Sequence, residues 1–188
     1  MTPAVFLDRD GVLNAIVRRG ETISSPRTPE ELVLEPEAES SLRALKRRGL
    51  PLFVVTNQPD VRRGLMTPAA LDEIHRRLRS ALPVDDIAAC LHDNADACAC
   101  RKPKPGLLLD LAQRHGIDLA RSWMVGDQDR DIACGRAAGC RTILLRRTYN
   151  SGLAAEADLV VESLSEAAAA ILAADPDPAQ RLGPEHVE

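Results

Sequence analysis

Two aspartates one residue apart follow the first apolar run of the chain. Residues 4–8 predict a buried strand, and Asp8 and Asp10 stand where it ends, just before Gly11. Residues two apart in an extended segment point the same way, so both carboxylates can face one small volume. They repel each other unless a cation lies between them, and Mg²⁺ prefers one or two carboxylates together with phosphate oxygens and water. The pair therefore predicts a magnesium site, although an isolated Asp-x-Asp-Gly would more simply be a turn.

Three later segments also place polar side chains where an apolar run stops. Thr56 and Asn57 offer a hydroxyl and an amide, which suit phosphate oxygens. Lys102 precedes a helix that Pro105 can begin, so a cation and a helix N-terminus can meet at one anion. Asp127 follows a short buried strand and supplies another acid. Each segment alone reads as a turn, a solvated basic pair or a helix cap, but their common position after apolar strands predicts one phosphate-handling site.

Three of the five cysteines lie close to a histidine, in a spacing typical of a metal site. Three thiolates and one imidazole would fill the four positions around Zn²⁺ and leave none open, which is typical of a structural site. We therefore predict a zinc-binding loop over residues 90–100 that holds Arg101 and Lys102 in place. The alternative is a loop of buried or free cysteines. The predicted zinc ligands are Cys90, His92, Cys98 and Cys100. The other cysteines, Cys134 and Cys140, are expected in the core, and His75 and His115 at the surface or its boundary.

Length and composition narrow the class of protein. The chain has 188 residues, a formal net charge of -4 and an aromatic content of 2%. These values favour one α/β domain and provide neither a basic surface nor stacking platforms for nucleic acid. No apolar run reaches the length of a membrane span, and no secretory leader precedes the first strand, so we expect a cytoplasmic protein that binds no membrane. We also expect a monomer.

Strand-like and helix-like segments alternate along residues 1–173. Strands are predicted at 4–8, 51–56, 86–92, 123–125, 141–145 and 158–161, and helices at 37–48, 67–82, 105–115, 129–138 and 163–173. Such alternation predicts right-handed crossovers and a single doubly wound, Rossmann-like parallel sheet. Residues 14–35 form a long polar excursion, and excursions of this length are often functional. The tail, residues 174–188, is rich in prolines and charges and is expected to be disordered.

The joint pattern resembles the haloacid dehalogenase superfamily of phosphotransferases over residues 4–173. The four motifs of that superfamily match Asp8-x-Asp10-Gly11, Thr56-Asn57, Lys102 and Gly126-Asp127-x3-Asp131. Within the superfamily, the Cys/His loop and the segment that follows it resemble the histidinol-phosphatase and heptose-bisphosphate-phosphatase group. That segment reads Cys100-Arg101-Lys102-Pro103-x-Pro105-Gly106.

The resemblance implies a Mg²⁺-dependent phosphatase that acts on a small phosphorylated sugar. Asp8 would be the nucleophile that forms an aspartyl phosphate, Asp10 the general acid and base, and Asp131 a supporting acid. The Mg²⁺ ligands would be Asp8, the backbone carbonyl of Asp10, and Asp127. The residues that bind phosphate or the remainder of the substrate would be Thr56, Asn57, Arg101 and Lys102.

Departures from the family pattern leave the sugar open. The chain has no large cap domain, Pro59-Asp60 stands where heptose enzymes commonly have Ser-Gly, and Gln128 stands where many have lysine. Arg101 favours a second anionic group, since a guanidinium can bind phosphate bidentately. The expected substrate is a heptose 1,7-bisphosphate hydrolysed at C7, with Arg18 or Arg19 able to reach the 1-phosphate. Histidinol phosphate or another small sugar phosphate is the alternative.

Two other classes of protein share part of the pattern. A phospho-accepting receiver module also places acids, a threonine and a lysine on a parallel sheet, but it has no cysteine loop and usually phosphorylates an aspartate after the third strand. A zinc-stabilised nucleic-acid binder is disfavoured by the acidic charge balance.

Overall fold

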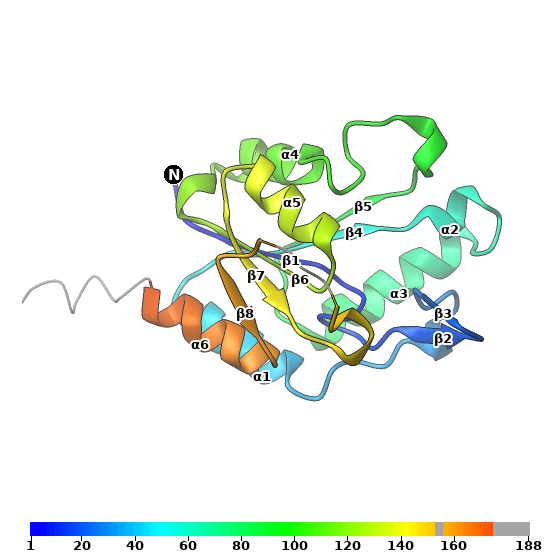
Figure 1. The fold of residues 1–188 in the computed structure, drawn as a ribbon, viewed down its shortest axis with the longest axis horizontal. Coiled ribbons are helices and arrows are strands. Elements are labelled where there is room, and N and C mark those ends of the chain that lie inside the picture. Colours follow the sequence, from blue (N-terminus) through cyan, green and yellow to red (C-terminus); the bar gives the residue numbers. More distant parts are fainter. Residues whose placement is uncertain (153–155, 175–188) are drawn as a thin grey trace, which may run out of the picture.

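The apolar runs form a parallel sheet of six strands in this computed structural model, which describes residues 1–152 and 156–174 (Figure 1). From one edge to the other, the strands are β5 (Asp86–Cys90), β4 (Leu52–Asn57), β1 (Val5–Leu7), β6 (Trp123–Gly126), β7 (Arg141–Leu145) and β8 (Leu159–Val161). Counted in chain order this arrangement is 3-2-1-4-5-6, the order of doubly wound nucleotide-binding folds. The predicted fold class is confirmed.

The order in which successive strands are added reverses at β1, which lies between β4 and β6. Leu7 is in register with Val54 of β4 and Val125 of β6. Because all three strands are parallel, Asp8, Thr56 and Asp127 come together at the same edge of the sheet. Open α/β sheets place their ligands in the crevice at this switch point.

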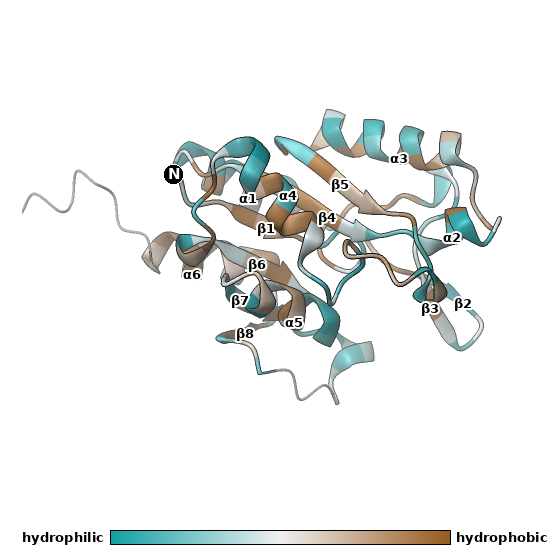
Figure 2. Ribbon diagram, turned by 90° about the horizontal axis from the view of Figure 1, so that it is seen from above, coloured by the Kyte–Doolittle hydropathy of each residue, from teal (hydrophilic) through white to brown (hydrophobic). Residues whose placement is uncertain are grey.

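Helices cover both faces of the sheet. One apolar cluster joins the sheet to α1 (Ala38–Arg47), α3 (Pro68–Ala81) and α6 (Leu164–Ala174), and a second joins it to α4 (Gly106–His115) and α5 (Asp129–Ala137). Alternate residues of a strand serve opposite faces, since Val5 and Leu7 of β1 belong to the first cluster and Phe6 to the second. Figure 2 shows apolar colour along much of the sheet and a mixture of polar and apolar colour on α3. Leu42 and Leu45 of α1 are fully buried, and each such side chain contributes about 1.5–3 kcal/mol to folding.

Local signals in the sequence fix several helix ends. Thr67 caps α3 as predicted, because its Oγ1 accepts a hydrogen bond of 3.1 Å from the backbone N–H of Ala70 while Pro68 is the first helical residue. Gly116 follows the last residue of α4 with a positive φ of 64°, and its backbone N–H donates a hydrogen bond to the Ala112 backbone oxygen at the end of the helix. The six strands of the sheet and the helices α1, α3, α4, α5 and α6 lie within a few residues of the predicted ones.

The excursion after β1 is folded rather than irregular. It contains a two-stranded antiparallel hairpin, β2 (Val17–Arg19) and β3 (Thr22–Ser24), and a bridge from Asn14 to Leu34 closes its base. A short helix, α2 (Pro59–Arg62), follows β4. Figure 1 shows the hairpin, α2 and the connection between β5 and α4 at the same end of the sheet, on the right. The described residues also contain short 3₁₀ helices at Pro29–Glu31, Asn94–Asp96, Leu119–Arg121 and Thr148–Asn150.

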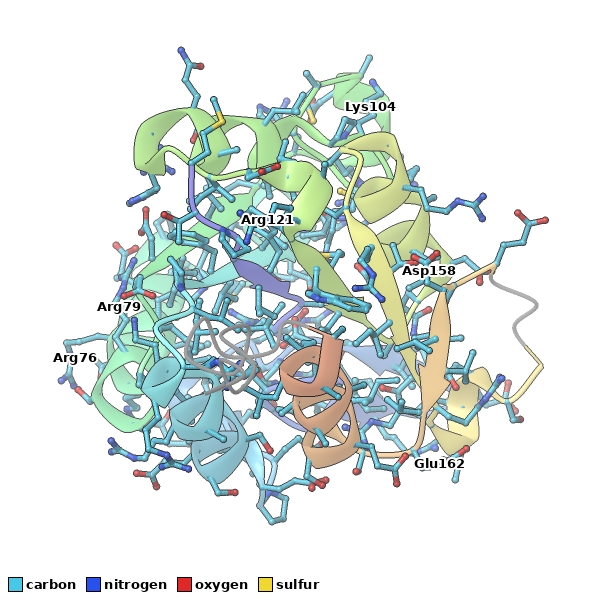
Figure 3. All side chains as sticks on the ribbon, turned by 90° about the vertical axis from the view of Figure 1, so that its left-hand side faces the viewer. Arg76, Arg79, Lys104, Arg121, Asp158 and Glu162 are labelled. Carbon is cyan, nitrogen blue, oxygen red and sulfur yellow. The ribbon has the colours of Figure 1, made fainter. Side chains whose placement is uncertain are left out.

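Charged side chains surround this core, with Arg76 and Glu162 at the rim of the view in Figure 3. In the described part of the chain, no helix has the length and apolar character needed to cross a membrane. The tail was predicted at 174–188, and residues 175–188 of it lie outside the described residues.

Candidate active site

The carboxyl edge of the sheet opens into a cavity of about 470 Å³. All seven residues that the sequence predicted for catalysis, phosphate binding and magnesium line it, together with residues of the hairpin and α2. Those seven are Asp8, Asp10, Thr56, Asn57, Arg101, Lys102 and Asp127. The structure thus brings together four segments that are far apart in sequence.

Lys102 is the buried cation of the site. Its Nζ lies 2.8 Å from Asp8 Oδ1 and 2.7 Å from Asp131 Oδ1, and it donates a hydrogen bond of 2.8 Å to the backbone oxygen of Val55. Burial lowers the pKa of Lys102, but Asp131 and then Asp8 outweigh burial and raise it on balance. The side chain is therefore a fixed positive charge against the Asp8 carboxylate.

Asp8 is buried, and the charged groups around it shift the pKa of its carboxyl group in opposite directions. Burial, followed by the charge of Asp131, raises its pKa to about 6, although Lys102 opposes the shift. Its Oδ1 also accepts a hydrogen bond of 2.7 Å from the backbone N–H of Arg9. A divalent cation at this carboxylate would favour its ionised form.

The site has the donors that Mg²⁺ requires. Carboxylate oxygens of Asp8, Asp127 and Asp131 lie within 4.8 Å of one another, and Asp127 Oδ1 is buried with no hydrogen-bond partner among the described residues. A buried, unpaired carboxylate oxygen is costly unless it has a ligand. Asp131 already pairs with Lys102 and accepts a hydrogen bond from the Gln128 backbone, so it supports Lys102 and is the least available of the three for a metal.

Asp127 is held by the loop after β7, which sequence reasoning missed. Tyr149 Oη donates a hydrogen bond of 2.6 Å to Asp127 Oδ2, and Asn150 Nδ2 donates one of 2.7 Å to the Asp127 backbone oxygen. A Cβ on Gly11 would lie 2.3 Å from Tyr149 Oη and 2.4 Å from Asp127 Oδ2. This crowding, with a φ of +83°, explains why glycine follows Asp10.

Asp10 is surrounded by hydrogen-bond donors. Its oxygens accept bonds from Arg9 (3.1 and 3.2 Å), Asn14 (3.0 Å), Ser25 (2.7 Å) and Gln58 (2.9 Å). Burial raises the pKa of Asp10, but Arg9 and then the hydrogen bonds from Asn14, Ser25 and Gln58 lower it on balance. The carboxylate is therefore ionised and fixed in one orientation in the unliganded protein.

Gln58 connects Asp10 to the phosphate-binding threonine. Its Nε2 donates to Thr56 Oγ1 at 2.8 Å as well as to Asp10. Because Thr56 Oγ1 accepts this bond, its own hydrogen is free to point toward an anion. Asn57 lines the cavity, and its side-chain nitrogen donates to the Lys102 backbone oxygen while its side-chain oxygen accepts from the Lys102 backbone N–H. Asn57 thus fixes the loop that carries the lysine.

The cysteine loop has a donor set that fits zinc. The distances among Cys90 Sγ, His92 Nδ1, Cys98 Sγ and Cys100 Sγ range from 3.2 to 3.7 Å for the contacts seen. A tetrahedron with Zn–S distances of about 2.3 Å places its sulfurs about 3.8 Å apart. The loop also holds Arg101, which donates to Asn94 Oδ1 and to the His92 backbone oxygen.

Arginines from three further segments line the cavity. They are Arg27 after the hairpin, Arg63 after α2, and Arg130 on α5. Asp60, in place of the glycine common in heptose enzymes, lies 2.8 Å from Arg27 and 3.5 Å from Arg63. Arg18 and Arg19 are not among the lining residues, and Arg19 bonds Ser24 and Glu31 instead. Arg18 is exposed and in register with Ile23, which does line the cavity, so the expectation that Arg18 or Arg19 binds the 1-phosphate stays a prediction.

His75 was also predicted wrongly. It is buried on α3 rather than at the surface, with 7% of its area exposed, and its Nε2 lies 3.1 Å from Arg9 Nη1. Helical spacing showed which residues share a face with His75, but not that this face packs against the segment after β1.

Sequence comparison supports the same chemistry. Residues 99–167 match the HAD-hydrolase-like family. The D-glycero-beta-D-manno-heptose-1,7-bisphosphate 7-phosphatase of Pseudomonas aeruginosa is 33% identical over 178 residues, which cover 89% of this chain and 97% of that relative. The D-glycero-alpha-D-manno-heptose-1,7-bisphosphate 7-phosphatase of Mycobacterium bovis is 34% identical over 178 residues, which cover 89% of this chain and 90% of the relative.

Solved structures are similar as well. The D,D-heptose 1,7-bisphosphate phosphatase of Bordetella bronchiseptica, in complex with magnesium and phosphate, superposes with a TM-score of 0.79 at 33% identity and covers 93% of this chain and 100% of its own. The enzyme of the same description from Burkholderia thailandensis superposes with a TM-score of 0.64 at 26% identity, covering 90% and 97% of the two chains. CbbY of Rhodobacter sphaeroides, at 17% identity, shares the fold.

Proposed function

Since the chain belongs to the haloacid dehalogenase superfamily of phosphatases and, within it, to the D-glycero-D-manno-heptose-1,7-bisphosphate 7-phosphatase family, we propose that it hydrolyses a heptose 1,7-bisphosphate at C7. The observation that carries the proposal is the buried Asp8, paired with Lys102 in a cavity whose outer part is lined by arginines. Mg²⁺ would be bound by Asp8, Asp127 and the Asp10 backbone oxygen, and Zn²⁺ by the cysteine loop.

The side chains of the cavity have the roles that phosphoryl transfer needs. Asp8 attacks phosphorus and carries the phosphoryl group as an aspartyl phosphate, which divides the displacement into two easier steps. Lys102 and the Thr56 hydroxyl stabilise charge on the phosphoryl oxygens, and bound Mg²⁺ neutralises more of that charge. Asp10 protonates the departing sugar oxygen and then removes a proton from the water that hydrolyses the intermediate. Asp10 must carry a proton when the sugar oxygen departs, and its hydrogen-bond partners hold the carboxyl group in one orientation for that transfer.

The outer arginines support a substrate with a second phosphate. Arg101 lines the cavity from the segment that follows the cysteine loop, and Arg27 and Arg63 line it from the segments after the hairpin and α2. Arg27 pairs with Asp60 and Arg63 pairs with Asp93 and Asp60, whereas the hydrogen bonds of Arg101 go to an amide and a backbone oxygen. Histidinol phosphate would bring a positive charge close to these guanidinium groups, which disfavours it.

The substrate assignment is tested by comparing kcat/KM for both anomers of the heptose bisphosphate, a heptose 7-phosphate and histidinol phosphate, with Mg²⁺ present. Arg101→Ala should reduce kcat/KM for the bisphosphate about ten- to a hundredfold more than for the monophosphate, because only the bisphosphate loses a charged hydrogen bond worth about 1.5–3 kcal/mol. Arg76→Ala is the matched control, since Arg76 is exposed on α3 and pairs with Glu73 away from the cavity. Zinc content of each variant must be unchanged, because Arg101 also bonds its loop. Histidinol phosphate as the best substrate, or an equal loss for all substrates, would reject the assignment.

The covalent mechanism is tested by Asp8→Asn. The variant should bind substrate and remain folded but lose turnover, because the amide keeps the shape of the side chain without its nucleophilic oxygen. Rapid quenching of the unaltered enzyme during turnover should trap phosphate on Asp8, detectable by peptide mass spectrometry. Substantial turnover by Asp8→Asn would exclude the aspartyl phosphate.

A further inference from the structure

Arg9 is a charged side chain with no exposed area, set between the two aspartates of the site. Its side chain is 0% exposed, and it is among the largest fully buried side chains of the described chain. Nε and Nη2 donate to the Asp10 carboxylate, and Nη1 faces His75 Nε2 at 3.1 Å. A buried guanidinium is costly unless its hydrogens are bonded, so both partners matter to its position.

The chemistry of the two groups fixes the direction of the bond to His75. Arginine has five N–H donors and no acceptor. His75 Nε2 must therefore accept the hydrogen, and its ring proton must be on Nδ1. Burial, followed by the charge of Arg9, lowers the pKa of His75 to about 3, which agrees with a neutral ring.

His75 is itself held firmly. Its neighbours Ile74, Leu71 and Leu78 on α3 are buried in the apolar clusters beside the sheet. The other donors to Asp10, which are Asn14, Ser25 and Gln58, are uncharged, and Arg9 is the cation bonded to Asp10 in the described structure. His75 thus connects a rigid helix to the one charged contact of the acid–base carboxylate.

We propose that His75 is a positioning residue for catalysis: by accepting a hydrogen bond from Arg9 Nη1, it keeps Arg9 in the orientation that aligns the Asp10 carboxylate with the leaving oxygen. The inference rests on the acid–base role given to Asp10 in the proposed function. Proton transfer depends on a donor–acceptor distance near that of a hydrogen bond, so a carboxylate that moves loses catalytic effect. His75 has no contact with substrate in this scheme and acts through Arg9.

Two substitutions separate the hydrogen bond from the packing. His75→Leu fills similar space but offers no acceptor, whereas His75→Gln places an amide oxygen near the position of Nε2. The readout is the ratio of kcat/KM for the sugar phosphate to kcat/KM for p-nitrophenyl phosphate. For each substrate, kcat/KM reports the steps up to formation of the aspartyl phosphate. The sugar oxygen needs a proton from Asp10 in these steps, whereas the aryl leaving group does not. Because the same enzyme sample gives both values, loss of folded protein cancels from the ratio.

We expect His75→Leu to lower this ratio by about tenfold or more and His75→Gln to restore it to within about threefold of the unaltered enzyme. Ile74→Val is the matched control, since it loosens the same turn of α3 without touching Arg9, and should leave the ratio unchanged. An unchanged ratio in His75→Leu, or a ratio in His75→Gln as low as in His75→Leu, would overturn the proposal. If the heptose bisphosphate is not a substrate, a primary alkyl phosphate replaces it in the ratio, so failure of the substrate assignment is distinguished from failure of this inference.

Discussion

The two carboxylate oxygens of Asp127 have different surroundings, and the difference leads to a testable role for Tyr149. Oδ2 accepts hydrogen bonds from Tyr149 Oη and Gln128 Nε2, whereas Oδ1 is buried and has no partner in the described structure. Tyr149 therefore fixes the rotamer that directs Oδ1 toward the proposed metal position. Groups that orient a metal ligand in this way typically change metal affinity by 10–100-fold when they are removed.

Tyr149→Phe should thus raise the Mg²⁺ concentration needed for half-maximal activity by about tenfold or more, with little change in kcat at saturating Mg²⁺. Titration of activity with Mg²⁺, and calorimetric titration of the metal alone, measure the effect. Thr148→Ala, an exposed change in the same turn, serves as the control. Equal Mg²⁺ affinity in Tyr149→Phe and Thr148→Ala would show that Tyr149 does not orient Asp127.

Residues of the site differ in how well sequence alone predicts them. Asp8, Thr56 and Lys102 were identified because each follows an apolar run or precedes a helix, and such local patterns are visible in a single sequence. Tyr149 and His75 were not, because their partners are 22 and 66 residues away. Tyr149 is the one tyrosine of the chain and follows a predicted strand, which is a weak signal. For His75, nothing local marks burial against an arginine.

The cysteine loop is the element on which the cavity most depends. Arg63, after α2, bonds Asp93 of this loop at 2.7 and 2.6 Å, and Asp60 connects Arg63 to Arg27. Loosening of the loop should therefore affect both walls of the cavity. We expect the purified protein to contain about one Zn²⁺ per chain, and Cys98→Ser to lose it with a fall in both thermal stability and activity.

Metal analysis, thermal unfolding and kcat/KM of the same Cys98→Ser preparation measure the three effects. Cys140→Ala is the matched control, because Cys140 is a buried cysteine outside the Cys/His group and should leave the zinc content unchanged. Absence of zinc from the gently purified protein would remove the metal site, and loss of zinc with unaltered kinetics would show that the loop does not organise the cavity.

The six-stranded sheet and its main helices were predictable, because their apolar residues recur at regular spacing over segments long enough to indicate a strand or a helix. The hairpin β2–β3 and helix α2 were not, since they have three to four residues each and bury almost none of them fully. Their conformations depend on distant contacts, such as the bridge between Asn14 and Leu34 and the ion pair between Arg27 and Asp60. Arg19 pairs with Glu31 through this hairpin, a contact that the sequence pattern does not indicate.

At the scale of the whole molecule, buried ionisable groups make stability depend on pH. The pKa of His75 falls from 6.5 to about 3 on folding, because burial and the charge of Arg9 disfavour the imidazolium. Below pH 6.5 the unfolded chain binds a proton that the folded chain does not bind, so the free energy of unfolding decreases as pH falls from about 6.5 toward 3. Asp8 contributes with the opposite sign in the absence of metal, since its pKa is raised on folding to about 6.

The contribution of His75 is isolated by comparing the unaltered protein with His75→Gln, which cannot bind the proton but keeps an acceptor for Arg9. Between pH 7 and pH 5, we expect the unaltered protein to lose stability more steeply than His75→Gln, by at most about 1.4 kcal/mol per pH unit. Urea unfolding at each pH measures the difference, and the Asp8 contribution cancels because both proteins contain it. Ile74→Val, which keeps both His75 and Asp8, should show the pH dependence of the unaltered protein. If His75→Gln also follows that curve, the ring is protonated in the folded state, and the hydrogen bond from Arg9 to an unprotonated Nε2 is excluded at those pH values.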